Sequence, residues 1–240
     1  MLKILSLNGI SIYQQLLIEE ALLRADDSNW CIINSGASDA IVLGISAKPE
    51  EVIDIERWEK NPVPVIKRFS GGGTVYIDPN TFFVTFICNE EFAGIPSYPH
   101  NILKWTENLY RQLLDGHDFH IQENDYILGN KKFGGNAQYI RKKRWLHHSS
   151  LLWDFHPSKM DTLLIPPRMP SYRQGRPHHE FIRSLRDVFP TCENLRHQLL
   201  EVIQNTFPTK QLFPEDLTNI LTRPHRRTTK ILTPTSSLNL

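Results

Sequence analysis

The sequence of 240 residues is poor in cysteine, has no long apolar run and carries almost no net charge. Its three cysteines, Cys31, Cys88 and Cys192, lack the spacing of a metal site or a disulfide framework, which favours a reducing compartment. No apolar run approaches the roughly 20 residues that a membrane-spanning helix requires. The net charge of +1 gives no overall field that would attract nucleic acid or an acidic membrane.

The N-terminal sequence MLKILSLNGISIYQQ has no small-residue cleavage site and little of the Arg and Ser typical of organelle transit peptides. We therefore expect the protein to be cytoplasmic. Hydrophobic residues make up 40% and charged residues 22%, as in a globular protein that buries one generous core. We expect neither a nucleic-acid-binding protein nor a membrane protein, so any basic site must be local.

Apolar patterns of both periods predict strands and helices, without the strict alternation of a doubly wound fold. The fold class predicted by this order is α+β. The expected helices lie over 12–27, 49–60, 100–116, 180–189 and 192–207. The expected strands lie over 30–36, 39–46, 63–69, 74–78 and 81–88, with a second β region over 118–155.

Three consecutive glycines, Gly71 to Gly73, interrupt strand-like sequence in KRFSGGGTVYID (67–78). Glycine weakens a strand because it loses the most backbone entropy and packs no side chain. One interpretation is a tight turn that needs glycine for its φ angles. The other is the close approach of an anion to exposed backbone N–H groups, beside Lys67 and Arg68. The triplet is not a dinucleotide-binding GxGxxG motif, because no helix follows it, and it lacks the Gly-Lys-Ser/Thr of a P-loop. The triplet alone leaves both interpretations open.

A second interruption, KKFGGNAQ (131–138), again places glycines within strand-like sequence beside lysine. Two such stretches, each next to a cationic side chain, predict two walls of one pocket. Because neighbouring strand residues face opposite ways, only one of Lys131 and Lys132 can point into that pocket.

The order of KRFSGGGTVYID, NDYILGNKKFGGNAQ and LHHSSLL resembles the lipoate–protein ligase family, within the biotin/lipoate ligase fold. That family reads Arg-x-x-Gly-Gly-Gly-x-Val-x-His-Asp, then Asn-Asp, then Lys-x-x-Gly-x-Ala, then His-His-Gly-Thr-Leu-Leu. The resemblance runs from about Gln14 to Phe189, and the stretch from Trp153 to Phe181 is similar to a variant branch. It implies mixed, largely antiparallel sheets flanked by helices. The implied catalytic domain covers 1–190, and 191–240 form a helical extension and polar tail rather than a full accessory domain.

The resemblance also implies roles for individual residues. Lys132 falls on the family's invariant lysine, three positions before Gly135, and is the implied catalytic residue. The residues implied to bind the acyl-adenylate are Arg68, Gly71, Gly72, Gly73, Thr74, Val75, Tyr76, Asp78, Asn80, Asp125, Gly135 and Ala137. Two departures stand out: Ile77 replaces a histidine, and Leu43-Gly44-Ile45-Ser46 replaces the usual sequence near the acyl pocket.

The implied activity is ligation of lipoate to a carrier. Lipoate attacks the α-phosphate of ATP to give lipoyl-AMP, and a carrier lysine then takes the acyl group. ATP with Mg²⁺ is implied, with no metal held by a dedicated protein site. The implied carriers are apo lipoyl domains of 2-oxoacid dehydrogenase complexes or the glycine cleavage H protein, and a separate accessory subunit is a further implied partner.

Other interpretations stay open at this point. A lipoyl or octanoyl transferase of the same fold takes its acyl group from a preformed acyl-AMP or an acyl carrier, and some of those enzymes use a cysteine nucleophile. A non-catalytic lipoyl-binding module is a third alternative. A biotin ligase is disfavoured because the Gly-Arg-Gly-Arg-x-x-Arg loop is missing. His147 and His148 diverge on a strand and are expected to be structural or substrate-facing, and the basic stretch 141–144 is either a carrier-steering or a solvated hairpin tip.

Overall fold

The computed structural model describes residues 1–166 and 169–232, and its main element is an eight-stranded sheet. The strand order is β11-β1-β2-β6-β10-β9-β8-β7. β1 runs parallel to β2 and β11, and every other neighbouring pair is antiparallel. The strands are β1 (Leu2–Asn8), β2 (Asn29–Ser35), β6 (Thr81–Asn89), β7 (Phe119–Gln122), β8 (Asp125–Leu128), β9 (Lys131–Arg141), β10 (Arg144–Leu152) and β11 (Thr209–Leu212).

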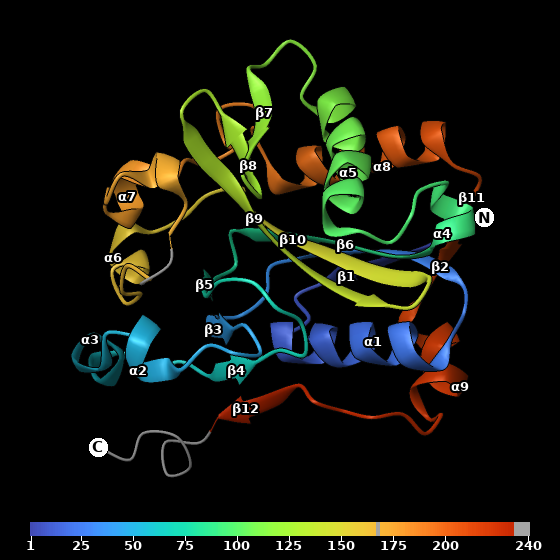
Figure 1. Cartoon of the computed structure of the whole chain (residues 1–240), viewed down its shortest axis with the longest axis horizontal. Coiled ribbons are helices and arrows are strands. Elements are labelled where there is room, and N and C mark those ends of the chain that lie inside the picture. The colour runs from blue at the N-terminus through green and yellow to red at the C-terminus, as the bar shows by residue number, and fades with distance from the viewer. Residues whose placement is uncertain (167–168, 233–240) are drawn as a thin grey trace.

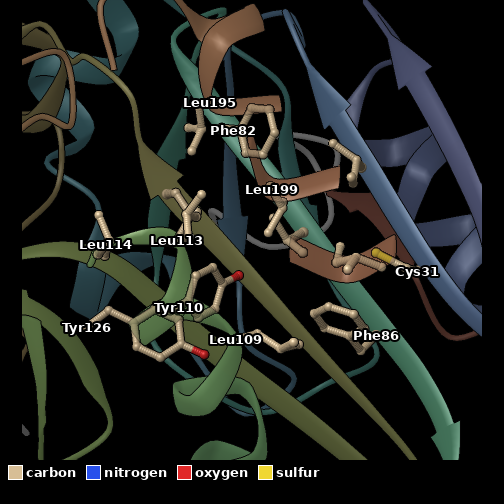
Figure 2. Close-up of a cluster of buried hydrophobic side chains, with 14 of the residues drawn as sticks. Cys31, Phe82, Phe86, Leu109, Tyr110, Leu113, Leu114, Tyr126, Leu195 and Leu199 are labelled. Carbon is tan, nitrogen blue, oxygen red and sulfur yellow. The ribbon is translucent and has the colours of Figure 1, made fainter. Parts of the chain in front are cut away.

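Helices cover both faces of this sheet (Figure 1). On one face α5 (Pro99–Leu113) and α8 (Cys192–Thr206) enclose a core that includes Phe82, Phe86 and Tyr110 (Figure 2). On the other face α1 (Ile12–Ala25) and α9 (Thr218–Leu221) enclose a second core. The short helix α4 (Glu90–Ala93) follows β6 directly.

A smaller sheet, ordered β12-β4-β3-β5, lies beside the first. Its strands are β3 (Ala40–Leu43), β4 (Val65–Lys67), β5 (Val75–Ile77) and β12 (Lys230–Leu232). A third apolar cluster packs it against short helices. These are α2 (Pro49–Val52), α3 (Ile55–Lys60), α6 (Pro157–Met160) and α7 (His178–Phe181), and the 3-10 turns are η1 (Ser171–Arg173) and η2 (Pro214–Leu217). The predicted class, α+β with mixed and largely antiparallel sheets, is confirmed.

Two predicted helices are wrong in extent. The helix expected over 49–60 is broken at Asp54, whose carboxylate accepts the N–H of Arg57 and caps α3, while Ile53 pairs with Leu163. The helix expected over 180–189 ends at Phe181. The chain beyond it turns its backbone groups to the sheet: the N–H of Arg183 donates to the carbonyl of Lys132 at 2.8 Å. In this segment, hydrogen bonds to the sheet outweigh the helical spacing of the apolar residues.

The C-terminal part of the chain contributes to both sheets. β11 extends the main sheet beside β1, and β12 pairs with β4 in the smaller one. Neither strand was expected, and residues 233–240 of the expected polar tail lie outside the described residues. The domain division at residue 190 stays a prediction. No helix in the described ranges has the length and apolar character to cross a membrane.

Candidate active site

The glycine triplet forms the connection from β4 to β5, and the guanidinium group of Arg68 holds it in place. Arg68 Nη2 donates to the carbonyls of Gly71 at 2.7 Å and Gly73 at 2.8 Å, and Nε donates to Ser70 Oγ at 3.0 Å. Burial lowers the pKa of Arg68 to about 10, which leaves the side chain charged at neutral pH. In this structure Arg68 therefore organises the loop, and its predicted contact with an adenylate phosphate stays a prediction.

The three glycines of the triplet differ in what surrounds them. Gly72 has a φ of +98°, and a Cβ there would lie 2.7 Å from Arg68 Nη2 and 2.9 Å from Ala137 Cβ. A Cβ on Gly71 or Gly73 would meet no atom of the described residues within 4 Å. The backbone turn accounts for Gly72, and the other two glycines leave open space against the main chain.

The structure brings the two glycine stretches together. Besides Arg68, a Cβ on Gly72 would meet two atoms of β9: the Cβ of Ala137 at 2.9 Å and the carbonyl oxygen of Asn136 at 3.3 Å. The segment after β3 also lies against the triplet. A Cβ on Gly44 would overlap the carbonyl oxygen of Gly72, and the N–H of Ile45 donates to the carbonyl oxygen of Ser70. Gly44 was not among the predicted site residues: the sequence placed it inside the strand expected over 39–46, whereas β3 ends at Leu43.

Lys132 lies beside the glycine pair on β9. Its Nζ pairs with Asp125 Oδ1 at 2.7 Å, and a Cβ on Gly135 would lie 3.6 Å from the same Nζ. An irregularity in the β8–β9 register lies next to it, between Tyr126 and Ile127. Lys131 makes no ion pair with the described residues. Of the two lysines, Lys132 is therefore the one whose ammonium group lies against the glycine stretch.

A segment from Ser171 to Arg183 lies against Lys132 and its partner. Tyr172 donates its hydroxyl proton to Asp125 Oδ2 at 2.7 Å, and burial with the neighbouring Asp125 raises the pKa of Tyr172. The N–H of Arg183 donates to the carbonyl of Lys132. This segment was not predicted as part of the site, because its resemblance to a variant branch gave no roles for its residues.

A series of hydrogen-bonded side chains, which runs from Glu19 through His148 to Ser70, supports the triplet. Glu19 Oε2 lies 2.9 Å from His148 Nδ1, and His148 Nε2 lies 3.0 Å from Ser70 Oγ. Glu19 is fully buried, and its Oε1 accepts the Thr85 hydroxyl at 2.6 Å. These hydrogen bonds hold the hydroxyl group of Ser70, the residue directly before the triplet. Nothing in the sequence marked Glu19, which reads as an ordinary helix residue.

His147 points in the opposite direction, as expected for adjacent residues on a strand. Its ring lies 3.0 Å from the hydroxyl of Tyr126 and 3.0 Å from the amide of Gln138. Burial lowers the pKa of His147 to about 3, followed by a smaller effect of His148. His147 is therefore a neutral core residue, and His148 is the one that reaches the site.

The predicted residues after the triplet lie on or near β5. Tyr76 donates to Asp39 Oδ2 at 3.0 Å, and Asp39 pairs with Lys159 at 2.7 Å. Val75 is half-buried and packs against the core under α1. Lys159 also approaches Asp78 Oδ2 at 3.8 Å. Asp39 and Lys159 were not predicted, and they link β5 to α6.

Two buried polar atoms in this region have no hydrogen-bond partner in the part of the chain that the structure describes. Asp78 Oδ1 accepts the N–H of Asn80 at 2.9 Å, but Asp78 Oδ2 and Thr74 Oγ1 find no partner among the described residues. Buried polar groups are rarely left unpaired, so such atoms are candidates for ligand contacts.

The basic stretch 141–144 lies away from the glycine stretches, at the far end of the β9–β10 hairpin. Residues 141–143 are exposed, but Arg144 is buried and donates to the carbonyls of Leu22 and Ser28. Arg144 is thus structural and not part of a solvated or steering tip. A surface cavity of about 760 Å³ lies at this end and includes none of the glycines of the two stretches.

Comparison with known proteins gives a family for this arrangement. A sequence profile described as the lipoyl protein ligase A/B catalytic domain matches residues 11–204. Inactive lipoate–protein ligase 2 of Plasmodium falciparum is 28% identical over 235 residues, covering 73% of this chain and 61% of that protein. Lipoate-protein ligase LplJ of Bacillus subtilis is 28% identical over 182 residues, covering 70% of this chain and 51% of that protein. The chain thus spans between half and two thirds of the length of these relatives.

Among solved structures, the fold is similar to that of a bipartite lipoate protein ligase from Thermoplasma acidophilum, studied with its E2 lipoyl domain. The TM-score is 0.73 at 18% identity, and the match covers 91% of this chain and 89% of that one. At this identity the likeness concerns the fold.

Proposed function

The chain belongs to the lipoyl protein ligase A/B catalytic domain family, and we propose on that basis that it is a lipoate–protein ligase. It activates lipoate with ATP to lipoyl-AMP and transfers the lipoyl group to a lysine of a carrier domain. The observation that carries this proposal is the position of Lys132, whose ammonium lies against Gly135 on the strand that Gly72 contacts. The fit of the three sequence motifs to one spatial cluster supports it.

The proposed roles follow from what each step requires. Attack of the lipoate carboxylate on the α-phosphate releases pyrophosphate, and this substitution depends on positioning and charge neutralisation. The main chain at Gly71 and Gly73 leaves room for the acyl-phosphate, because a Cβ at either position would meet no atom of the described residues within 4 Å. Lys132 stabilises the charge that develops on the acyl carbonyl and phosphate oxygens in both half-reactions. The carrier amine then attacks the acyl carbonyl, and AMP leaves.

Mg²⁺ is proposed to accompany the triphosphate. The described residues contain no group of three or more His, Cys, Asp or Glu side chains that could hold a metal ion. Mg²⁺ in nucleotide sites is commonly held by one or two carboxylates together with substrate phosphates. We assign that limited role to the buried Asp78, whose Oδ2 lies 3.8 Å from the Lys159 ammonium and has no hydrogen-bond partner among the described residues.

The cysteines do not favour the alternative that uses a thiol nucleophile. Burial raises the pKa of Cys31 and of Cys88, both fully buried in the core. Burial also raises the pKa of Cys192 at the start of α8, more than its hydrogen bond with Ser35 and the charge of Arg196 lower it. A nucleophilic cysteine needs a lowered pKa and access to the acyl group. This supports a mechanism without a covalent enzyme intermediate.

A transferase that starts from preformed lipoyl-AMP is the second candidate, and one observation favours it. The donors of Arg68 are directed at loop carbonyls and the hydroxyl of Ser70, which leaves fewer cations for a triphosphate. The proposed carriers for both candidates are apo lipoyl domains of 2-oxoacid dehydrogenase complexes or the glycine cleavage H protein. The proposed catalytic domain covers 1–190, with a separate accessory subunit as a further partner and the cytoplasm as the location.

The test is incubation with lipoate, ATP, Mg²⁺ and an apo lipoyl domain, followed by the mass of the carrier and the release of AMP. A parallel reaction replaces lipoate and ATP with synthetic lipoyl-AMP. Modification in both reactions supports the ligase, and modification only with lipoyl-AMP supports the transferase. Because one relative is named as inactive, binding of lipoyl-AMP without modification in either reaction would leave a lipoyl-binding module.

A further inference from the structure

A cavity of about 760 Å³ lies where the β9–β10 hairpin turns, at the opposite end of β9 from Lys132 (Figure 1). It is lined by the end of α1, by α4 with the residues on either side of it, and by the hairpin turn 141–144. Its volume is within the roughly 300–1,000 Å³ of typical small-molecule sites. The strand from Gly135 to Arg141 is roughly 20 Å long. The cavity is therefore separate from the candidate active site, and no residue that lines it has a role in the proposed function.

The hairpin turn brings four cationic side chains to this cavity. They are Arg141, Lys142, Lys143 and Arg144. Arg141 and Arg144 are a directly opposed cross-strand pair, and like charges in such a pair lower the stability of a sheet. Residues 141–143 are exposed and form no ion pair with any residue that the structure describes. The turn therefore concentrates positive charge that no carboxylate of the described residues neutralises by direct pairing.

Arg144 forms the rigid part of the cavity wall. It is only 8% exposed, and its Nη groups donate to Asn89 Oδ1 at 2.9 Å and to the carbonyl of Ser28 at 2.7 Å. These acceptors are neutral, so they hold the guanidinium in place without cancelling its charge. Its Nε is buried and has no acceptor in the described part of the chain. An anion in the cavity would supply the negative charge that the neutral acceptors do not.

The same cavity is also lined by three carboxylates, Asp27 just after α1 and Glu90 and Glu91 on α4. Glu90 Oε1 accepts the N–H of Ser97 at 2.7 Å, whereas Asp27 and Glu91 are exposed. These carboxylates repel a bare phosphate, but they accept hydrogen bonds from the hydroxyl or amino groups of an organic ligand. The mixed lining therefore favours an organic phosphate with donor groups over an inorganic anion.

We propose that this cavity is a binding site for a small organic phosphate, whose phosphate group contacts the cations of the hairpin turn and whose hydroxyl or amino groups contact Asp27 and Glu91. Guanidinium and ammonium groups are common partners of phosphate oxygens in proteins. Binding also relieves the repulsion between Arg141 and Arg144. The site does not depend on the proposed function, because none of its residues takes part in lipoate activation or transfer.

Calorimetric titration with ribose 5-phosphate at low ionic strength tests the proposal. The double variant Arg141→Gln/Lys143→Gln should bind it at least about tenfold more weakly than wild type, the loss expected from one charge-assisted hydrogen bond. The matched control is Lys104→Gln/Lys210→Gln, which removes the same charge from exposed lysines outside the cavity and should bind like wild type. Lys132→Ala should also bind ribose 5-phosphate like wild type, because it changes only the candidate active site.

Two further measurements separate the parts of the site. Asp27→Asn/Glu91→Gln should weaken the binding of ribose 5-phosphate relative to that of inorganic phosphate, because only the sugar donates to the carboxylates. Without ligand, Arg141→Gln should unfold at no lower temperature than wild type, because it removes a like-charge pair. Ribose 5-phosphate should raise the unfolding temperature of wild type and leave that of Arg141→Gln/Lys143→Gln unchanged.

Equal affinity of the hairpin variant and its control for ribose 5-phosphate would overturn the proposal. So would loss of binding in Lys132→Ala, which would place the ligand in the candidate active site, and so would the absence of binding to wild type at millimolar ribose 5-phosphate. Tighter binding of a hexaglutamate peptide than of ribose 5-phosphate would assign the cavity to an acidic protein partner instead. None of these outcomes depends on whether the protein ligates lipoate.

Discussion

The two glycine stretches look alike in sequence and are built differently in the structure. In the triplet, the middle residue Gly72 is fixed by a positive φ and by contact with Arg68, while Gly71 and Gly73 border open space. In the pair, a Cβ on Gly134 would lie 2.8 Å from a methyl group of Leu151, and one on Gly135 would make only ordinary contacts. Each stretch therefore contains one glycine that the fold requires and at least one that it does not.

The difference separates structural glycines from ligand-facing ones. A glycine that the fold requires should affect stability when substituted, whereas a glycine beside open space should affect only a molecule that binds there. The two stretches also differ in their support. The pair lies inside the long β9–β10 hairpin, and the triplet depends on residues far apart in the chain, among them Glu19, His148 and β12.

The largest expected effect on activity comes from replacing Lys132, the lysine beside the glycine pair. Lys132→Ala should lower the rate of lipoyl transfer on the order of 10²–10³-fold, or about 2.7–4 kcal/mol, as removal of one oxyanion donor does elsewhere. Carrier mass against time is the measurement. Lys131→Ala is the matched control and should keep wild-type activity, because Lys131 makes no ion pair with the described residues. A reversed result would show that the wrong lysine has been assigned.

The next effect concerns the middle of the triplet. Gly72→Ala places a Cβ against Arg68 and Ala137 at a positive φ, so the free energy of unfolding should fall by about 2–3 kcal/mol. Gly71→Ala should leave that free energy within about 0.5 kcal/mol of wild type and should still weaken lipoyl-AMP binding. Urea denaturation with lipoyl-AMP titration separates the two effects. If Gly71→Ala bound lipoyl-AMP normally, the triplet would be a turn and nothing more.

A smaller loss of stability is expected within the pair. Gly134→Ala places a methyl group among the side chains of Leu151 and Tyr126, which can shift, so the expected cost is about 1–2 kcal/mol. Gly135→Ala meets Lys132 and Ser150 at 3.6 Å and should cost little stability. Its effect should fall on transfer, through the position of the Lys132 ammonium. Equal destabilisation by both substitutions would remove the distinction drawn within the pair.

The sequence predicted the parts of the site that lie within short motifs. Lys132 and the glycines are neighbours along the chain, and strand alternation could separate Lys132 from Lys131. Glu19 could not be found in this way, because its partners Thr85 and His148 are remote in sequence. The sequence identified Arg68 as a site residue but not its hydrogen bonds to the loop carbonyls. A motif does not show which N–H groups already donate within the protein.

The fold was predictable to a similar depth. The α+β class and most strands followed from apolar periodicity, and α1, α5 and α8 matched their expected positions. β11 and β12 are short edge strands of four and three residues that exist because β1 and β4 pair with them. The expected helix over 180–189 had helical spacing, yet its backbone groups bond to β9 and β10 instead. Pairing between distant segments decides such cases, and local patterns do not contain it.

The smallest expected effect tests the distant support of the triplet. Glu20 is buried in α1, and its carboxylate accepts the N–H of Thr228 at 2.9 Å and of Thr229 at 3.1 Å, just before β12. β12 in turn pairs with β4 through Lys230 and Lys67, next to the triplet. Glu20→Gln keeps the shape of the side chain but replaces one acceptor oxygen with an amide NH₂ group, which would face the N–H donors of Thr228 and Thr229. The free energy of unfolding at pH 7 should therefore fall by about 1 kcal/mol.

The pH dependence and location of that loss identify its cause. Burial alone would raise the pKa of Glu20, but the hydrogen bonds from Thr228 and Thr229 outweigh it, and the pKa is lowered from 4.5. A lowered folded pKa means that the carboxylate stabilises the protein above pH 4.5, and that this contribution is lost as pH falls through the folded value. The difference between wild type and Glu20→Gln should therefore shrink on acidification. At pH 7, hydrogen exchange should quicken over 65–73 and stay unchanged over 131–138, and equal quickening in both would show that the stretches share one support.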